Sequence, residues 1–412
     1  METVCFKKYK KSGVVYATEH ATQFGFYHGN KDWVNLGQGA AEAGNIEGAL
    51  PRVDNITISA KQHGYAPVGG LKKLRENIAF MYNDLFRVNK KSKYSYKNIE
   101  VSGGGRIVIS RIIAAMQDIN VGYFVPDYTS YDGILSVFNN IKPIPIFLSS
   151  KNGFKFNHRE LKNRIKQENI KALLLSNPSN PTGAVIQGDD LKKLVELAKK
   201  EKFYLIIDEF YFNFIYNKKF ELVSSAKFID DIENSGIIII CGLSKAWRYS
   251  GWRVCWAIGP QNIMEIASRV GSFLDGGANN PLQKSAIKLV GAKNILKESR
   301  VIQKLFRKKR DYMMKRFKKM DFIFGSEPDG AFYFWLNLKK LPKEINNGMK
   351  FFERMLKEKV IVVPGKFFDL NPHKLRKEEN FTNYIRIGYG PEIKILKEGI
   401  DRIERVVRSC KK

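Results

Sequence analysis

Short apolar segments rich in Ile, Leu and Val alternate with amphipathic segments through the middle of the chain, and this alternation limits the fold more than any other feature. The apolar segments include KALLLSNP, FYLIIDEF and GIIIICGL, and GDDLKKLVELAKKEK is one of the helix-like stretches between them. Strands that are apolar along their whole length are typical of parallel sheets covered by helices on both faces. The pattern therefore predicts an α/β fold with a mostly parallel sheet flanked by helices.

The pattern changes near residue 290, where a long basic amphipathic segment is followed by short strands at AFYFWLN, VIVVPG and YIRIGYG. This change predicts a second, smaller α+β domain. The chain of 412 residues is long enough for two domains and has no low-complexity linker. We expect residues 51–290 to form the large domain and residues 291–412 the small one. Residues 1–50 are expected to form an N-terminal arm and part of the small domain.

Cysteine usage and hydropathy limit the compartment. Cys5, Cys241, Cys255 and Cys410 form no CxxC pair, which argues against a metal site or a disulfide framework and favours a reducing compartment. The N-terminus lacks the apolar segment of a signal peptide, and the longest aliphatic run, residues 237–240, is too short to cross a bilayer. We therefore expect a cytoplasmic protein without membrane association.

The formal net charge of +29, from 70 basic and 41 acidic residues, would attract nucleic acid, anionic membranes or acidic metabolites. The lysines are spread over segments such as LAKKEK and KRFKKM, mostly where an amphipathic helix would face water, without a compact patch interleaved with aromatics. We therefore expect a lysine-rich solvated surface and no nucleic-acid site.

Two apolar strands end in side chains suited to chemistry. Asp208 follows the strand in FYLIIDEFYFNF, at the end where α/β sheets bind ligands, and Tyr211 comes three residues later. Such an aspartate more often caps the next turn; the functional interpretation is a buried anion that keeps a pyridinium nitrogen protonated. In LLLSNPSNPTG, two prolines and a glycine stiffen the loop and aim the amide of Asn180 at a fixed point.

A third strand, in GIIIICGLSKAWRYSGWR, leads into Ser244 and Lys245, with Arg253 eight positions after the lysine. A lysine amine is a nucleophile only when neutral, and nearby cations in a site with little water lower its pKa. Arg248 and Arg253 are candidates for that positive charge. A Ser-Lys dipeptide carries no information without this context.

Together, NPSNPTG, DEFY and LSKAWRYSGWR closely resemble, in order and spacing, the fold-type I class I/II aminotransferases, which are pyridoxal 5'-phosphate (PLP) enzymes. WVNLGQGAAE, HGYAPVGGLKKLRENIA and NYIRIGYG extend the resemblance over nearly the whole chain. The resemblance makes Lys245 the catalytic residue that carries the cofactor as a Schiff base, and Asp208 the partner of the pyridinium nitrogen. It makes Asn180 and Tyr211 the groups that hydrogen-bond the phenolate oxygen, and Tyr128 the ring that stacks on the pyridine, for which a core tyrosine is the alternative.

The resemblance also implies how the phosphate is bound. Gly104, Gly105 and Arg106 would hold it where a helix begins after the strand IEVS, and Ser244 and Arg253 would close around it. Glycines allow close approach, and a helix N-terminus favours an anion. The sequence GGGR by itself is a weak signal.

Two further roles concern the substrate and a second subunit. Arg386 alternates with two isoleucines on a strand, and an exposed arginine is the commoner explanation for such a position. The resemblance implies instead a fork that binds the substrate α-carboxylate, helped by the backbone of Gly37 to Gly39. Tyr65 would reach the phosphate of a neighbouring subunit, which implies a homodimer.

The chain departs from the family at several positions. Gly242 stands where a Ser or Thr often contacts the phosphate, and Cys255 replaces a common glycine, for which we expect a packing role only. The segment Leu274–Pro281 offers no arginine for a second carboxylate, so an aspartate-like substrate is not indicated, although Arg52 or a lysine from elsewhere could serve.

These roles predict an aminotransferase that moves an amino group between an L-amino acid and a 2-oxo acid. The first carbanion is shared with elimination, decarboxylation and cyclisation, so a PLP-dependent lyase, decarboxylase or cyclase is the alternative. A nucleic-acid-binding regulator of similar sequence carries a separate helix-turn-helix domain, for which we expect no room before Trp33.

Overall fold

The computed structural model describes residues 9–411, so Cys5 lies outside the described part. Its centre is a seven-stranded sheet in the order β2-β8-β7-β6-β5-β3-β4. The strands are β2 (Ile99–Ser102), β3 (Ile119–Val125), β4 (Ile141–Phe147), β5 (Ile170–Ser176), β6 (Tyr204–Asp208), β7 (Ile237–Gly242) and β8 (Cys255–Ile258). β4, β3, β5, β6 and β7 are parallel to one another, and β8 runs antiparallel to β7 and β2. The predicted mostly parallel sheet is confirmed.

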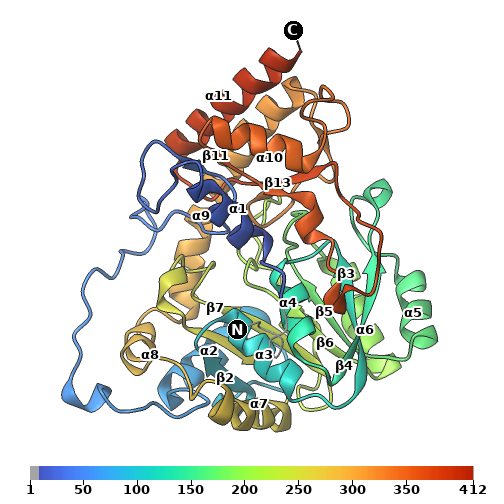
Figure 1. Ribbon diagram of the computed structural model, residues 1–412. Helices are drawn as coiled ribbons and strands as arrows, with labels where there is room; N and C mark the ends of the chain where they lie inside the picture. The colour runs from blue at the N-terminus through green and yellow to red at the C-terminus, as the bar shows by residue number, and fades with distance from the viewer. Residues whose placement is uncertain (1–8, 412) are drawn as a thin grey trace, which may run out of the picture.

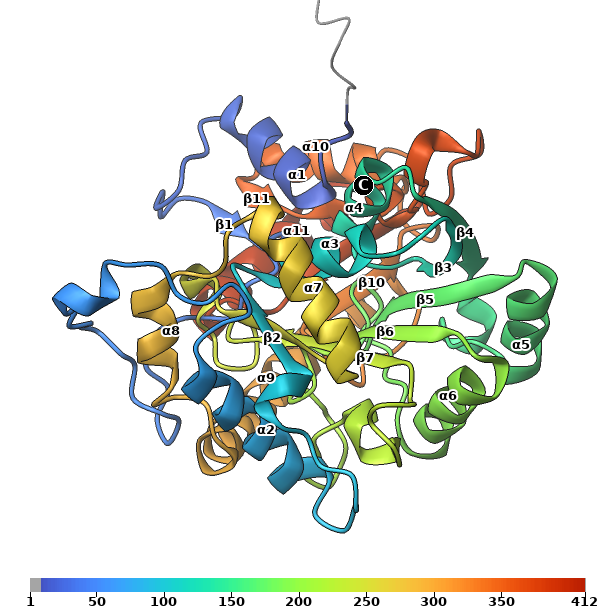
Figure 2. The same ribbon diagram turned by 90° about the horizontal axis from the view of Figure 1, so that it is seen from below.

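Helices cover both faces of this sheet, because successive apolar side chains of a strand point to opposite sides. Ala172 and Leu174 of β5 pack in one core with Ile109, and Leu173 packs in another with Leu191. The first core joins the sheet to α3 (Gly105–Ala114), α4 (Ser130–Val137) and α7 (Gln261–Leu274), and the second joins it to α2 (Lys72–Phe86), α5 (His158–Gln167) and α6 (Gly188–Glu201). Figures 1 and 2 show the two layers from two sides.

A smaller antiparallel sheet lies beside the first, in the order β12-β13-β10-β9. Its strands are β9 (Ile323–Phe324), β10 (Tyr333–Asn337), β12 (Val363–Pro364) and β13 (Tyr384–Gly388), and α10 (Gly348–Lys357) and α11 (Ile393–Cys410) belong to the same region of the chain. β1 (Val34–Asn35) pairs in parallel with β11 (Val360–Ile361), and α1 (Gly13–Thr22) packs near β11 and β12. The N-terminal segment is thus attached to the C-terminal sheet, while domain boundaries at residues 50 and 290 remain a prediction.

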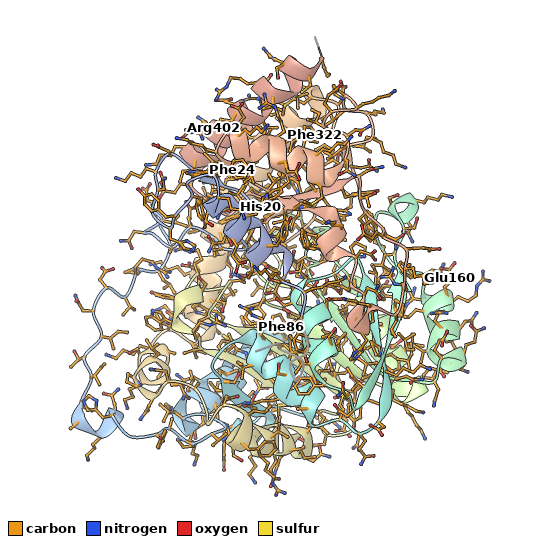
Figure 3. All side chains as sticks on the ribbon, viewed as in Figure 1. His20, Phe24, Phe86, Glu160, Phe322 and Arg402 are labelled. Carbon is orange, nitrogen blue, oxygen red and sulfur yellow. The ribbon has the colours of Figure 1, made fainter. Side chains whose placement is uncertain are left out.

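The helix α9 (Ala292–Lys319) runs from the large sheet to the small one, and α8 (Asn280–Ala286) precedes it (Figure 1). Phe86 is buried in the core beside the large sheet and Phe322 near the small sheet, whereas Glu160 is exposed on α5 (Figure 3). The segment of residues 51–66 extends away from the body of the chain (Figure 1). Within residues 9–411, none of the helices combines the length and the apolar composition of a membrane span.

Candidate active site

A cavity lies at the carboxyl edge of the parallel strands, where the large sheet meets β10 and β13 of the small one. Strand ends supply its floor, because Ser176 ends β5, Asp208 ends β6, and Ser244 follows β7. The predicted residues that line it are Gly39, Gly105, Arg106, Tyr128, Asn180, Asp208, Tyr211, Ser244, Lys245, Arg253 and Arg386. Gly104 lies directly beside it, and Tyr65 is fully exposed elsewhere.

Lys245 stands in a tight turn after β7, in which the Arg248 amide donates to the Lys245 carbonyl at 3.0 Å. Its Nζ donates to the carbonyl of Gly39. Burial, followed by the charges of Arg386 and Arg253, lowers the pKa of Lys245 from 10.5 to about 8. The amine is therefore much closer to its neutral, nucleophilic form than an ordinary lysine.

The prediction that Arg248 supplies this positive charge is wrong. Its backbone has a left-handed φ of 62°, and its side chain is buried against α9, where Nε lies 2.7 Å from Oε1 of Glu298. Arg386, which comes from β13, takes the place expected for Arg248. Arg386 could not be found from its distance to Lys245 along the sequence, because only the packing of the two sheets brings β13 close to the lysine.

Asp208 is buried, and the Tyr131 hydroxyl donates to its Oδ2 at 2.9 Å. The amide of Phe210 donates to Oδ1 at 3.3 Å. Burial raises the pKa of Asp208 to about 6, against the effect of the Tyr131 hydrogen bond and of Lys245. The sequence interpretation missed Tyr131, although its position three residues after Tyr128, at the start of α4, was a usable signal.

Arg386 is buried to 1% exposure, which excludes the exposed-strand alternative. Its Nη1 donates to Oδ1 of Asn180 at 3.0 Å, and its Nη2 donates to the carbonyl of Gly37. The guanidinium also lies 4.4 Å from the ring centre of Tyr333. The side-chain oxygen of Asn180 and the carbonyl oxygen of Gly37 thus contact the guanidinium that the family resemblance assigned to a substrate carboxylate.

Tyr333 on β10 is a second residue that the sequence interpretation missed. Its hydroxyl lies 2.7 Å from that of Tyr211, and a side chain at Gly39 would meet the Tyr333 hydroxyl at 2.7 Å. Burial raises the pKa of Tyr211 well above its ordinary value and that of Tyr333 to about 12. Both hydroxyls therefore stay protonated near neutral pH and are available as hydrogen-bond donors.

The buried carboxylate of Asp127 anchors the loop that carries Asn180 through hydrogen bonds to Ser176. The hydroxyl of Ser176 donates to Oδ1 of Asp127 at 2.5 Å, and the Asn180 amide donates to that hydroxyl at 3.1 Å. The amide of Tyr128 also donates to Asp127, at 2.7 Å. Asp127 therefore fixes Tyr128 and Asn180 together, a role that the sequence pattern did not reveal.

The start of α3 has the geometry of an anion site. Gly104 has φ of 138°, and a Cβ placed there would lie 1.9 Å from Nη2 of Arg253. Arg253 donates from Nη1 to the Ser244 hydroxyl at 3.4 Å and to the carbonyl of Ser250 at 2.9 Å. A guanidinium, a hydroxyl and a helix N-terminus at Gly105 converge on the same space, which favours a phosphate group.

The two departures at Gly242 and Cys255 are coupled. These residues face each other across β7 and β8, and a Cβ at Gly242 would lie 2.6 Å from Sγ and 2.7 Å from Cα of Cys255. The Cys255 Sγ lies 3.5 Å from the Ser244 hydroxyl. The close approach of β7 and β8 therefore excludes a Ser or Thr at position 242, and Cys255 also contacts a residue of the candidate phosphate site, so its role exceeds the packing that we expected.

The proposed sources of a second carboxylate-binding group lie away from the cavity of their own chain. Arg52 stacks on Tyr249, with 3.5 Å from its guanidinium carbon to the ring centre, and donates to the carbonyl of Trp247 at 3.0 Å. The segment Leu274–Pro281 contains no arginine, and its Asp275 instead accepts a hydrogen bond from Nε of Arg111 at 2.8 Å. Arg106, by contrast, has an exposed side chain at the cavity mouth.

Comparisons with known proteins agree with this geometry. The family described as aminotransferase class I and II matches residues 31–403. The aspartate aminotransferase of Thermotoga maritima is 30% identical over 350 residues, which cover 84% of each chain. The probable aspartate/prephenate aminotransferase of Aquifex aeolicus is 28% identical over 354 residues, which cover 83% of each chain.

The fold also matches solved structures. The aspartate aminotransferase of Thermus thermophilus with maleate superposes with a TM-score of 0.79 at 22% identity, over 96% of this chain and 97% of that one. The aromatic aminotransferase of Pyrococcus horikoshii superposes with a TM-score of 0.75 at 25% identity, over 95% and 99% of the two chains. The matched region includes every cavity residue from Gly39 to Arg386.

Proposed function

Because the chain belongs to the class I and II aminotransferases and is thus a PLP-dependent enzyme, we propose that the cavity between its two sheets is the active site, with Lys245 as the residue that binds the cofactor. The observation that carries this proposal is the meeting of three groups in one cavity. These are an amine of lowered pKa, the buried carboxylate of Asp208 and the buried guanidinium of Arg386.

The residues around the cavity fit the cofactor. Asp208 supplies an anion for the protonated ring nitrogen, whose positive charge would offset the burial that raises the carboxyl pKa. The hydroxyl of Tyr211 and the side-chain amide of Asn180 are available as donors to the phenolate oxygen. The start of α3 suits the phosphate, since the lack of a side chain at Gly104 lets the Arg253 guanidinium pack directly against the beginning of the helix.

The bound cofactor supplies an electron sink for the carbanion that forms at the substrate α-carbon. The chain's own residues do the rest. Lys245 would hold the cofactor until the substrate amine replaces it, and its freed Nζ would then take the proton that leaves the α-carbon. Asp208 would keep the ring nitrogen protonated, and Arg386 would hold the substrate carboxylate by charge-assisted hydrogen bonds. The Gly37 carbonyl and the Asn180 amide must shift as that carboxylate takes over Arg386.

Replacement of Lys245 tests this proposal. We expect Lys245→Ala to lose the cofactor's visible band, its trapping by borohydride and all but a trace of 2-oxo acid formation. The control is Lys284→Ala, a change on α8 outside the cavity. Full turnover in Lys245→Ala would refute the assignment, and ammonia release without an oxo-acid acceptor in the wild type would favour a lyase.

We further propose that two copies of the chain complete each other's sites through Tyr65. The complete exposure of Tyr65 on the extended segment of residues 51–66 supports this proposal (Figure 1). Mixed dimers of Lys245→Ala and Tyr65→Ala chains test it. If Tyr65 acts in the partner's site, one site of the mixed dimer has both native residues and regains activity; if it acts within its own chain, mixing restores nothing.

The amino donor is proposed to be acidic. The printed names of the relatives support this choice, as does Arg106, whose exposed side chain borders both the main cavity and an adjoining one lined by Lys10 and Lys11. We expect Arg106→Gln, which keeps the backbone amide that would hold the phosphate at the start of α3, to slow the half-reaction with aspartate about tenfold or more through loss of a charged hydrogen bond, and to leave that with alanine unchanged. Equal effects on both amino acids would exclude this role.

A further inference from the structure

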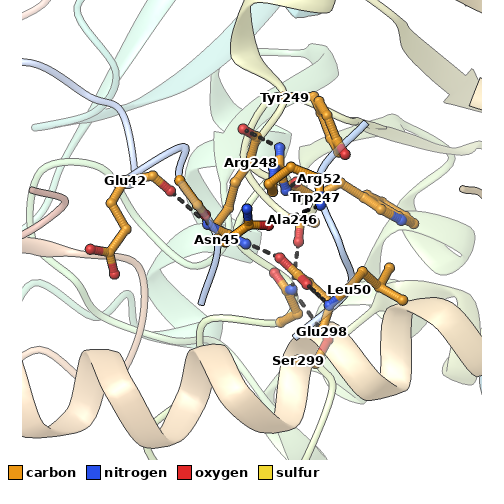
Figure 4. Close-up of polar contacts among 12 residues, drawn as sticks. Glu42, Asn45, Leu50, Arg52, Ala246, Trp247, Arg248, Tyr249, Glu298 and Ser299 are labelled. Atoms are coloured by element: carbon orange, nitrogen blue, oxygen red, sulfur yellow. Dashed lines mark hydrogen bonds and ion pairs between the residues drawn. The ribbon is translucent and has the colours of Figure 1, made fainter. Parts of the chain in front are cut away.

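The buried ion pair between Arg248 and Glu298 joins three parts of the chain beside the active site (Figure 4). Arg248 comes from the turn that carries Lys245, and Glu298 comes from α9. The Nη1 of Arg248 donates to the carbonyls of Glu42 and Gly44, both at 2.8 Å. On the other side of the pair, the Leu50 amide donates to Oε2 of Glu298 at 3.0 Å.

The segment held by this pair leads directly into the substrate side of the cavity. Gly37 and Gly39 lie a few residues before Glu42, and their carbonyls accept hydrogen bonds from Arg386 and from the Lys245 Nζ. The backbone of Glu42 is therefore fixed on one side by Arg248, and the backbone five residues earlier contacts the fork of Arg386. A shift at residues 42–44 would move both glycine carbonyls relative to Lys245.

A second set of contacts, from α9 and from the residues that follow β13, holds the same segment. The buried Nζ of Lys309 lies 3.0 Å from Oε1 of Glu42 and donates to the carbonyl of Pro391 at 2.7 Å. The amide of Glu42 donates to the carbonyl of Gly390 at 2.9 Å. Glu42 is thus bound through its backbone to Arg248 and through its side chain to α9, which leaves its position little freedom.

Stability alone is a poor explanation for the pair. Arg248 and Glu298 are 2% and 1% exposed, and the desolvation of two such charges offsets most or all of their attraction. Moreover, the Nη2 of Arg248 has no hydrogen-bond partner among residues 9–411. Apolar residues of similar size would often give an equally stable fold. Arg248, however, uses two nitrogens in a fixed geometry, Nε toward Glu298 and Nη1 toward both carbonyls, and only a guanidinium supplies that arrangement.

We propose that Arg248 is a positioning residue that holds residues 42–44, so that the backbone of Gly37 and Gly39 keeps its place beside Arg386 and Lys245 and only the Gly37 carbonyl has to turn away when the substrate carboxylate binds. This inference rests on the proposed role of Arg386 as the carboxylate-binding group. Arg248 acts through the backbone and touches neither substrate nor cofactor. It therefore affects substrate affinity more than cofactor affinity.

The test uses variants that separate the charge from the fork. Arg248→Met with Glu298→Gln removes both charges, and the glutamine keeps an oxygen acceptor for the Leu50 amide. Arg248→Lys keeps the positive charge but has a single nitrogen in place of Nε and Nη1, so it cannot reproduce the contacts with Glu298 and with both carbonyls. We expect KM for the amino donor to rise about tenfold or more in both variants, with kcat changed less than about threefold. The dissociation constant of PLP and the urea midpoint of the holoenzyme should stay near the wild-type values.

The control is Arg269→Gln, which breaks an ion pair with Glu265 whose side chains are 75% and 55% exposed. Native KM in the charge-free double variant overturns the proposal, as does a rise in KM that comes with weaker cofactor binding and a lower urea midpoint. Arg386→Lys, measured in parallel, tests the proposed carboxylate role separately. Native KM in that variant would reject the role of Arg386 whatever the Arg248 variants do.

Discussion

The lowered pKa of Lys245 makes a quantitative prediction for the apoenzyme. A pKa of about 8 leaves about a quarter of the amine neutral at pH 7.5, whereas an ordinary lysine is only about 0.1% neutral. Because only the neutral amine attacks an acylating reagent, Lys245 should react about 200-fold faster than its ordinary pKa would allow. Its rate should level off above about pH 9.

Two substitutions should move this midpoint in opposite directions. Arg386→Gln removes the neighbouring cation that lowers the pKa most, so the midpoint should rise. Asp208→Asn removes an anion that raises the pKa, so the midpoint should fall, and by less, because Asp208 contributes least among the neighbouring charges.

The assay is brief acylation of the apoenzyme at a series of pH values, followed by digestion and quantification of the Lys245 peptide. Exposed lysines in the same digest report the general pH dependence of the reagent. The reasoning would be refuted if the Lys245 rate kept rising up to pH 10.5, or if both variants shifted the midpoint in the same direction.

Two further substitutions test the backbone of the site. Gly104→Ala should weaken PLP binding about tenfold or more, because its φ of 138° strains any side chain and its Cβ would displace the guanidinium of Arg253; fluorescence titration of the apoenzyme measures this, and Gly103→Ala, which meets no atom within 4 Å, should bind normally. Gly242→Ser should lower the free energy of unfolding by about 1–3 kcal/mol, because its Cβ would overlap the backbone Cα of Cys255 as well as its sulfur; urea unfolding measures this, adding Cys255→Gly should restore only part of the loss, and an unaffected single variant would contradict the predicted overpacking.

The sequence was sufficient to predict the sheet and the residues at its carboxyl edge. Apolar strands and stiff loops are local patterns, and Asp208 and Lys245 each follow such a strand directly. The resemblance to a family then identified Arg386, whose own strand pattern favoured an exposed side chain.

The contacts between distant segments could not be predicted in the same way. Arg248 lies three residues after Lys245, which suggested an electrostatic role, but its left-handed backbone turns the side chain toward α9. Tyr131, Asp127 and Tyr333 gain their roles only when the strands and the two sheets come together. No periodicity in the sequence encodes that arrangement.

The pairing of Gly242 with Cys255 also sets how closely two strands can approach. A Cβ at position 242 would lie 2.7 Å from the backbone Cα of residue 255 as well as 2.6 Å from its sulfur, so a side chain at 242 is excluded whatever residue stands opposite. A related chain with a serine at position 242 must therefore hold β7 and β8 further apart at this pair. A wider spacing of the two strands, rather than a smaller residue at position 255, should distinguish the structure of such a chain from this one.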